Sequence, residues 1–372
     1  MRALCIFRVI EIAVNVNNQD GPKQMPDDKN IKRALEKALR LRQSDEVWEG
    51  TGRIARTWIA PKNKPPYRPY AVMFVSGEKG ILRCELVDSP PTPERVFEEL
   101  LNAMRRPFFG SGFARRPSVV YLDNAEFVAI LSPWLAELNI SCKYRRVLPM
   151  LENALYEVFK GMNKREPIPG LLSLPDVTPP VVGHLYQLAA AYYRLAPWQW
   201  LSDMDPIEIC YPPDGQSRYA VVMGSGGEVF GLSVYDTLDD LRGVYMQLPL
   251  QQRYESSTWF AFYFDAAMAM TFEDLEAKEK FGWPIAGEQA YPIFARTTRN
   301  GEPTIPDKRD LFWAEAALAA ILAYFEKHQK DYRRVSRPAK TTLTISTISH
   351  EEPVFLRIPA IRQDKLFQLM VE

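Results

Sequence analysis

Two stretches far apart in the chain share a pattern that restricts the fold. Residues 217–240 read SRYAVVMGSGGEVFGLSVYDTLDD, and residues 68–93 read RPYAVMFVSGEKGILRCELVDSPPTP. Each has an alternating apolar segment, a short turn with glycine and a second alternating segment, which is typical of a β-hairpin. Both contain YAV in the first strand and SG in the turn. The similarity predicts an internal duplication, and therefore two related units.

The length of the chain supports the same division. A chain of 372 residues exceeds the usual size of a single hydrophobic core. Five prolines fall between Asn163 and Val181, and prolines at this density disfavour both helices and central strands. We therefore expect an N-terminal segment, a first α/β unit, a Pro-rich linker, a second α/β unit and C-terminal strands (residues 1–29, 30–162, 163–180, 181–330 and 331–372).

The predicted fold class is mixed α/β (α+β). Each unit reads as an antiparallel β-meander followed by alternating helices and strands, rather than as a series of βαβ repeats. The meanders are expected to begin with strands at residues 53–60 and 207–211. The apolar runs SVVYLD (118–123) and TWFAFYFD (258–265) are expected to occupy equivalent places in the two units.

Composition excludes some classes of partner. Lys plus Arg and Asp plus Glu number 46 each, so no global field attracts nucleic acid or an anionic membrane. The longest apolar helical run, at residues 316–325, is shorter than the roughly 20 residues that a bilayer requires. Four widely spaced cysteines (Cys5, Cys84, Cys142 and Cys210) show no metal-ligand spacing. We expect reduced thiols and a cytoplasmic protein without a cofactor.

Asp123 and Asp265 are the first catalytic candidates, because each ends an apolar run just before a predicted helix. Many α/β proteins place catalytic groups at the end of a central strand. Aspartate is also a preferred helix N-cap, and we favour that interpretation. Asp88 and Asp236 form a second equivalent pair, each followed by a hydroxyl residue. We expect them to act as caps as well.

Asp203 and Asp205, in LSDMDP, are the other candidates. A close acidic pair can bind a divalent cation or serve acid–base chemistry, but a turn before proline is the favoured interpretation. The histidines are His184, His328 and His350. None has the spacing of a catalytic triad or a metal site, so no metal is expected, and His184 should pack in an apolar neighbourhood.

The glycine-rich turn at residues 224–227 (GSGG) resembles a phosphate-binding loop only superficially. No GxxxxGK[ST] pattern is present, and the glycines precede a strand rather than a helix. No helix N-terminus would therefore face an anion. The sequence predicts a hairpin turn.

Basic residues gather at two places. Arginine beside aromatic side chains can bind single-stranded nucleic acid by charge and stacking, although solvated helix ends and loops are the favoured interpretation. The first cluster contains Arg105, Arg106, Arg115 and Arg116, with Phe108, Phe109 and Phe113 nearby; the second contains Lys327, Lys330, Arg333, Arg334, Arg337 and Lys340.

Two parts of the chain resemble known families. Residues 181–325 resemble a family of uncharacterised bacterial domains, through LAPWQWLSDMDPIEI, YAVVMGSGGEVFGLSVYDTLDDL and YPIFARTTRNGEPTIPDKRDLFWAEAALAAILAYF. Residues 118–158 resemble a second uncharacterised family, through VVYLDNAEFVAILSPWLAELNI and RRVLPMLENALYEV. The resemblance covers about half of the chain. It implies a bacterial source and a fold, but no activity and no catalytic residues.

We therefore expect a soluble, non-catalytic binding or interaction module. Its partner would be a protein or a small-molecule ligand in the groove between the two units. One alternative is a metal-assisted hydrolase that uses Asp123 with Asp265, or Asp203 with Asp205. The other is a nucleic-acid-binding protein that uses the arginine clusters. We lean against catalysis because no convergent catalytic set is present.

Overall fold

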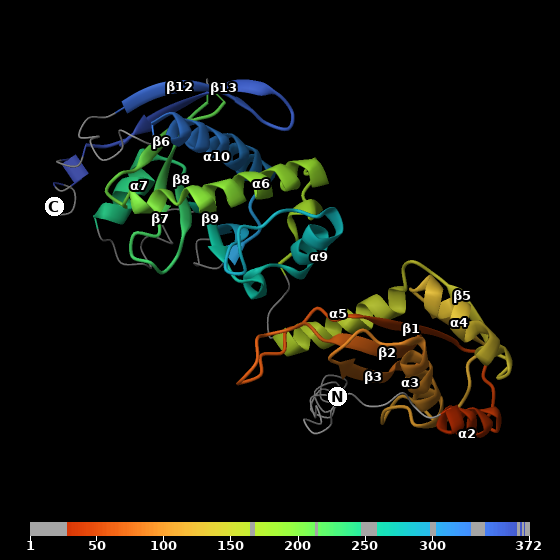
Figure 1. Cartoon of the computed structure of the whole chain (residues 1–372). Helices are drawn as coiled ribbons and strands as arrows, with labels where there is room; N and C mark the ends of the chain where they lie inside the picture. Colours follow the sequence, from red (N-terminus) through yellow and green to blue (C-terminus); the bar gives the residue numbers. More distant parts are fainter. Residues whose placement is uncertain are drawn as a thin grey trace. The chain divides into compact units, whose positions relative to one another are not determined.

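The computed structural model describes residues 28–163, 168–212, 215–246, 259–297, 303–328, 339–362, 365–366 and 368. The chain divides into two compact units, residues 1–167 and 168–372 (Figure 1). Each unit combines helices with one β-sheet. The mixed α/β class predicted from the sequence is therefore confirmed.

The described strands of unit 1 form a sheet in the order β3-β2-β1-β4-β5. Strands β1, β2 and β3 make an antiparallel meander, whereas β4 runs parallel to β1 and β5 runs parallel to β4. The elements are β1 (Val47–Ile54), β2 (Tyr70–Ser76), β3 (Gly80–Val87), β4 (Val119–Leu122), β5 (Ser141–Tyr144), α2 (Asp28–Leu39), α3 (Pro93–Arg105), α4 (Ala125–Ala136) and α5 (Pro149–Asn163).

Both faces of this sheet are covered by helices. Alternation along β2 sends Val72 and Phe74 into a core with α3 and α4, and sends Met73 and Val75 into a second core with α5. Such alternation is the two-residue period of a strand. Unit 1 is therefore a layer of helices, a sheet and a second helical layer.

The described strands of unit 2 form a sheet in the order β11-β10-β9-β8-β7-β6-β13-β12, and every neighbouring pair is antiparallel. The C-terminal strands pair with each other and extend this sheet beside β6. The strands are β6 (Ile207–Cys210), β7 (Ser217–Met223), β8 (Gly231–Tyr235), β9 (Trp259–Asp265), β10 (Tyr291–Thr297), β11 (Pro303–Thr304), β12 (Ala339–Ser346) and β13 (Glu351–Ile358).

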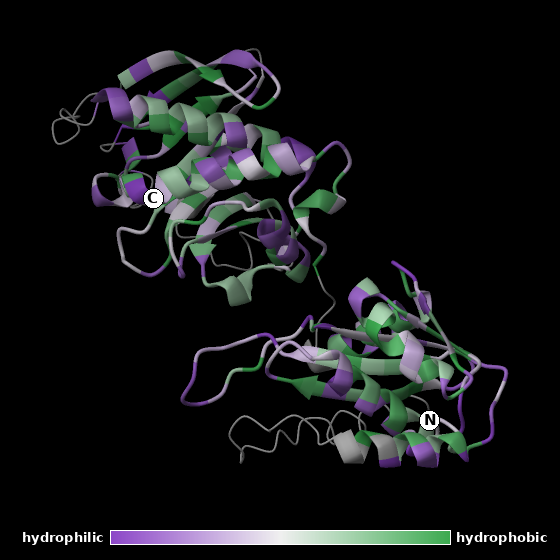
Figure 2. Cartoon of the chain, turned by 45° about the vertical axis from the view of Figure 1, so that its right-hand side comes forward, coloured by the Kyte–Doolittle hydropathy of each residue, from purple (hydrophilic) through white to green (hydrophobic). Residues whose placement is uncertain are grey.

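Three helices pack against this sheet: α6 (Pro179–Leu195), α7 (Leu238–Tyr245) and α10 (Lys308–His328); a fourth helix, α9 (Phe272–Phe281), packs against α6. Tyr192 of α6 contacts the ring of Phe262 in β9 and donates a 3.2 Å hydrogen bond to the carbonyl of Gly231. A Cβ at Gly231 would lie 2.1 Å from the carbonyl oxygen of Phe262, so only glycine fits there. Figure 2 shows hydrophilic and hydrophobic residues on the same helices, as expected where one face packs on a sheet.

Two sequence-based expectations about topology are wrong. The first strand of unit 1 covers residues 47–54 rather than 53–60, and Ile59 forms only an isolated bridge with Tyr67. The runs 118–123 and 258–265 are also not equivalent. The chain passes through α3 to place β4 parallel beside β1, whereas β9 lies antiparallel beside β8, at the opposite end of the meander. The shared pattern extends to the meander and not to the next strand.

Candidate functional site

Asp123 lies where β4 ends, beside the end of the parallel strand β1. The Thr51 hydroxyl is 2.8 and 2.9 Å from its two carboxylate oxygens, and Arg53 Nη1 is 3.6 Å away. Burial raises the pKa of Asp123, although Thr51 and Arg53 both favour the ionised form. Asp123 thus lies at the end of a strand and has a raised pKa, and both features are typical of residues in functional sites.

Asp123 is not a helix cap, contrary to the favoured interpretation. The side chain of Asn124 caps α4, because its Oδ1 accepts hydrogen bonds from the backbone N–H groups of Glu126 (2.8 Å) and Phe127 (3.1 Å). Asn124 takes the role that the sequence assigned to its neighbour, since both residue types are good caps. The carboxylate of Asp123 is therefore directed toward β1.

The groups around Asp123 are paired with one another. Arg53 donates hydrogen bonds to both carboxylate oxygens of Glu152 on α5, at 2.7 and 2.8 Å. Glu49 is buried and accepts a 3.0 Å hydrogen bond from the backbone N–H of Leu151 in the first turn of α5. We call Glu49, Thr51, Arg53, Asp123 and Glu152 the Asp123 network. It ties α5 to the sheet, and its acids are already engaged.

Asp265 has a different environment. It is the last residue of β9, is exposed, and accepts a 2.6 Å hydrogen bond from the N–H of Ala266. The cap of α9 is Thr271, which accepts a hydrogen bond from Asp274 N–H. Asp123 and Asp265 therefore share neither surroundings nor a capping role, and the equivalence predicted from the sequence is wrong.

Asp203 and Asp205 lie in a turn. Asp205 Oδ2 accepts hydrogen bonds from the N–H and hydroxyl of Ser202, at 3.1 and 3.0 Å, and the backbone carbonyl of Asp203 accepts one from the Tyr245 hydroxyl. This geometry agrees with the turn interpretation. Among the residues that the structure describes, no group of three or more His, Cys, Asp or Glu side chains could hold a metal ion.

Asp88 and Asp236 do not cap helices either. Asp88 accepts a 2.6 Å hydrogen bond from the Tyr67 hydroxyl, while Thr92 caps α3. Asp236 forms ion pairs, and the adjacent Thr237 caps α7 by accepting a 3.1 Å hydrogen bond from the N–H of Asp240. In each case a threonine further along the chain performs the capping, as threonine often does.

The ion pairs of Asp236 belong to a charge cluster that sequence reasoning missed. Asp310, with no exposed area, lies 3.0 Å from Arg218 and 2.7 Å from Arg296. Asp236 lies 3.1 and 3.0 Å from the same two arginines. Burial of Asp310 is the largest single influence and opposes ionisation, but the hydrogen bonds and charge of Arg296, together with the charge of Arg218, outweigh it and lower the pKa of Asp310. Because Arg218 and Asp310 are 92 residues apart in the sequence, no local sequence pattern predicts the cluster.

His184 is paired rather than only packed. Its Nδ1 lies 2.5 Å from Glu315 Oε1, and this buried carboxylate also accepts a 2.8 Å hydrogen bond from the N–H of Ile348. The contact joins α6 to α10. Its partners are internal, which favours a structural role.

The first basic cluster is divided by the fold. Arg115 donates to both carboxylate oxygens of Glu46, at 2.6 and 2.9 Å, and this hydrogen bonding lowers the pKa of Glu46 to about 2. Arg116 is buried and donates to the carbonyls of Leu41 and Leu138. Arg115 and Arg116 therefore make structural contacts, which do not favour the nucleic-acid alternative for these two residues. Of the four arginines, only Arg105 and Arg106 remain candidates.

Residues 107–114, which we call the Phe loop, follow these arginines. The side chains of Phe109 and Phe113 are 98% and 92% exposed. Single exposed apolar residues are common on proteins, but two phenylalanines this exposed on one short loop form an unusual apolar surface.

The Phe loop is held in place from within. The buried Ser111 donates a 2.6 Å hydrogen bond to the carbonyl of Ile81, and Arg115 donates to the carbonyls of Ser111 and Phe113, at 3.1 and 2.9 Å. Phe108 N–H bonds to Leu82, 2.9 Å away. Gly110 and Gly112 have φ angles of +89° and +91°, which L side chains rarely adopt. The backbone thus presents the two rings from an anchored loop.

The second basic cluster falls mostly outside the described residues. Lys327 and Lys340 are exposed, while Lys330, Arg333, Arg334 and Arg337 lie outside the described part of the chain. The nucleic-acid prediction for this cluster stays untested. The glycine turn at residues 224–227 joins β7 toward β8 with a 3.0 Å hydrogen bond between Gly227 N–H and the Gly224 carbonyl, as a hairpin turn should.

Comparison with known proteins identifies the class of both units. Residues 34–159 match the family model described as Domain of unknown function (DUF6930), and residues 183–345 match that described as Domain of unknown function (DUF7309). Two distinct family models of domains of unknown function thus match the chain in tandem. No curated protein matches the chain. Within the described residues, no helix has the length and apolarity needed to cross a membrane.

Proposed function

We propose that this protein is a non-catalytic binding module and that the Phe loop is its contact element. The observation that carries the proposal is the near-complete exposure of Phe109 and Phe113 on an anchored loop. Burying one phenylalanine side chain stabilises a complex by about 1.5–3 kcal/mol. Because the loop is already ordered, little of this gain would be lost to ordering on binding.

The charged networks support a binding role over a catalytic one. The carboxylates of Asp123, Glu152, Asp236 and Asp310 all have protein partners. A catalytic acid or base needs access to a substrate proton. In these networks the acids stabilise contacts between helices and sheets instead.

A nucleic-acid partner remains the second candidate. Fewer residues are available to contact it than the sequence suggested. Arg106 is exposed and stands next to the Phe loop, and exposed aromatic rings can stack on bases. Arg115 and Arg116 no longer support it. The expected ligand in a groove between the two units stays a prediction.

We also infer a reducing, cytoplasmic location. Cys84, Cys142 and Cys210 are free thiols in the structure, and free thiols persist in reducing compartments. Cys5 lies outside the described residues.

The test compares the full-length protein with the double variant Phe109→Ser, Phe113→Ser. Each is immobilised, a cell extract is passed over it, and any captured component is purified and its binary affinity measured. The expected result is capture by the native protein and at least a hundredfold weaker affinity for the variant, because two apolar contacts are lost. Nuclease treatment of the extract separates a protein partner from a nucleic acid.

The matched control is Val229→Ser, which removes a half-exposed apolar side chain from a loop of unit 2. It should bind like the native protein. Undiminished affinity in the double variant, with unchanged circular dichroism, would exclude the Phe loop as the contact element.

A further inference from the structure

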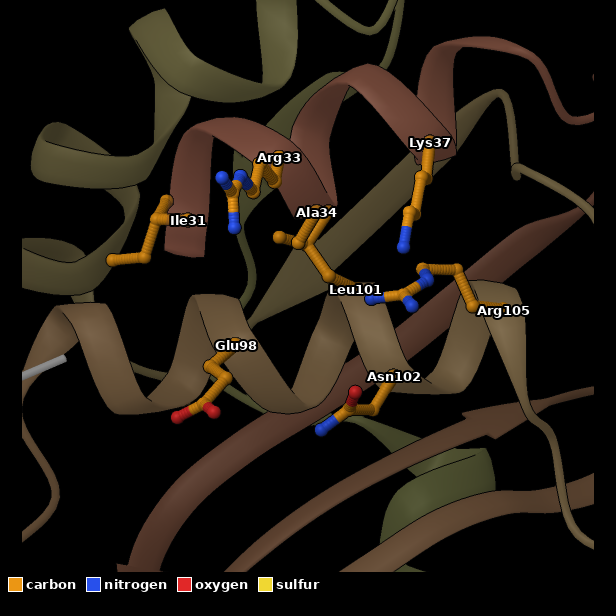
Figure 3. A pocket seen from close by; sticks show the side chains of 8 residues that line it. All are labelled: Ile31, Arg33, Ala34, Lys37, Glu98, Leu101, Asn102 and Arg105. Atoms are coloured by element: carbon orange, nitrogen blue, oxygen red, sulfur yellow. The ribbon is translucent and has the colours of Figure 1, made fainter. Parts of the chain in front are cut away.

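A pocket with a volume of about 370 Å³ lies between α2 and α3 (Figure 3). This size is within the usual range of small-molecule sites, roughly 300–1,000 Å³. None of the residues that line it belongs to the Phe loop. The pocket is therefore a second feature, independent of the proposed contact element.

Three of the eight residues that line the pocket are cationic. Arg33 and Lys37 come from α2, and Arg105 comes from the last turn of α3. Figure 3 shows Lys37 extending from α2 toward Arg105. Within the part of the chain that the structure describes, none of the three forms an ion pair with a carboxylate. Like charges that face each other repel, and an anion between them would relieve the repulsion.

The acid at this pocket is engaged elsewhere. The carboxylate of Glu98 lies 2.7 Å from Arg95 Nη1, and in Figure 3 it points away from α2. Arg95 in turn bonds to Glu85 on β3. Glu98 is thus part of a chain of ion pairs directed toward the sheet, and it does not neutralise the three cations.

The lining of the pocket also includes apolar side chains. Ile31 and Ala34 of α2 and the buried Leu101 of α3 contribute to its lining. A guanidinium matches the geometry of phosphate oxygens, and a lysine adds a point charge. Apolar side chains among such cations suit the organic part of a ligand.

We propose that this pocket binds a small organic phosphate, with Arg33, Lys37 and Arg105 as the cations that attract the phosphate and with Ile31, Ala34 and Leu101 as the apolar contacts of the organic group. The proposal does not depend on the Phe loop. The same phosphate chemistry occurs in a free ester and in the backbone of a nucleic acid, and the test separates these sources.

The experiment is isothermal titration of the full-length protein with pyrophosphate, AMP, adenosine and an eight-residue oligothymidylate. We expect AMP to bind, pyrophosphate to bind more weakly, and adenosine not to bind. Raising the salt concentration should weaken AMP binding, because the contacts are ionic. Lys37→Gln and Arg105→Gln should each weaken it at least tenfold, since each removes a charge-assisted hydrogen bond.

Arg106→Gln is the matched control, because Arg106 is the exposed neighbour of Arg105 and does not line the pocket. It changes the net charge equally and should alter AMP affinity less than twofold. Equal losses in Arg105→Gln and Arg106→Gln would overturn the proposal in favour of general electrostatic attraction. Failure of AMP and pyrophosphate to bind would also overturn it, and binding of the oligonucleotide alone would assign the cations to nucleic acid.

Normal capture through the Phe loop with no AMP binding would remove the pocket proposal and leave the binding module intact. If AMP binds but the phenylalanine substitutions do not affect capture, the Phe loop proposal is removed and the pocket proposal stands. The two proposals therefore fail separately.

Discussion

The two units place the strand after the meander at opposite ends of it. In unit 1, β4 runs parallel beside β1, and Asp123 meets Thr51 across that pair. In unit 2, β9 runs antiparallel beside β8, and Asp265 at its end is exposed. The same order of elements along a chain therefore gives acids with unrelated surroundings, because the neighbouring strand decides what each acid contacts.

In unit 2, a buried charge cluster is centred on Asp310. Replacing it should have the largest effect: Asp310→Ala leaves Arg218 and Arg296 without their buried partner, and breaking such pairs costs about 3–5 kcal/mol. Hydrogen exchange should show loss of protection in α10 and none in α5. Asp239→Ala, which removes an exposed pair with Arg242 on α7, is the control and should cost less than about 1 kcal/mol. If Asp310→Ala and Asp239→Ala lower the stability of unit 2 by similar amounts, the Asp310 cluster contributes little to that stability.

A second effect confined to unit 2 depends on pH. Burial raises the pKa of Asp274 to about 6 from an ordinary value of 3.8. Between these values the folded state holds a proton that the unfolded state has lost, so unit 2 should lose about 3 kcal/mol as pH rises from 4 to 6 and change little above 6. Hydrogen-exchange rates of the backbone amides in α9, measured between pH 4 and 6 and corrected for the intrinsic pH dependence of exchange, report this loss of stability.

Asp274→Asn should flatten this pH dependence, because the amide does not ionise. Its oxygen can still accept the hydrogen bond that Leu171 N–H donates to Asp274. A pH profile that is unchanged in the variant would assign the dependence to another group.

In unit 1, Thr51→Val tests the contact that β4 creates. Thr51 is fully buried and its hydroxyl is bonded to Asp123, so valine should leave the carboxylate partly unsatisfied and cost about 1–3 kcal/mol. Protection should fall in α4 and α5. Thr51→Ser keeps the hydroxyl and should therefore lower the stability of unit 1 less than Thr51→Val does. If both substitutions have the same effect, packing of the methyl group and not the hydrogen bond stabilises this edge.

The smallest effect is expected at Asp265. Asp265→Ala removes an exposed carboxylate and should change the stability of unit 2 by less than about 0.5 kcal/mol, whereas Asp123→Ala should destabilise unit 1 by at least 1 kcal/mol. Equal losses, measured by hydrogen exchange in each unit, would restore the equivalence of the two aspartates.

Elements whose signals are local could be predicted from the sequence. Strands β2 and β3 lie within the predicted hairpin at residues 68–93, and β7 and β8 lie within that at residues 217–240, because a two-residue period needs only neighbouring residues. The first strand of unit 1 was misplaced because the cluster of alternating residues after Arg53 resembles a strand, while Gly50 and Gly52 interrupt the pattern of β1. Glycine has low strand propensity, yet both positions pack closely against side chains, including Phe74 and Phe127.

The candidate sites could be predicted less well. The sequence pointed to Arg105, Arg106, Arg115 and Arg116 as one surface, but the bond from Arg115 to Glu46 spans 69 residues and has no local signature. The Phe loop was visible only as aromatic residues near arginines. That Phe108 packs beneath Arg83 while Phe109 and Phe113 remain exposed depends on how the loop meets β3.

The amino-acid sequence by itself determined the mixed α/β class, the paired hairpins and the helices, since periodicity and turn residues act over a few positions. Only the tertiary structure decided which strand follows each meander in the sheet, which acids are buried with arginines, and which cations and rings have no partner among the described residues. These outcomes depend on contacts between residues tens of positions apart, such as Thr51 with Asp123 and Arg218 with Asp310. Such contacts form only after the strands have found their neighbours.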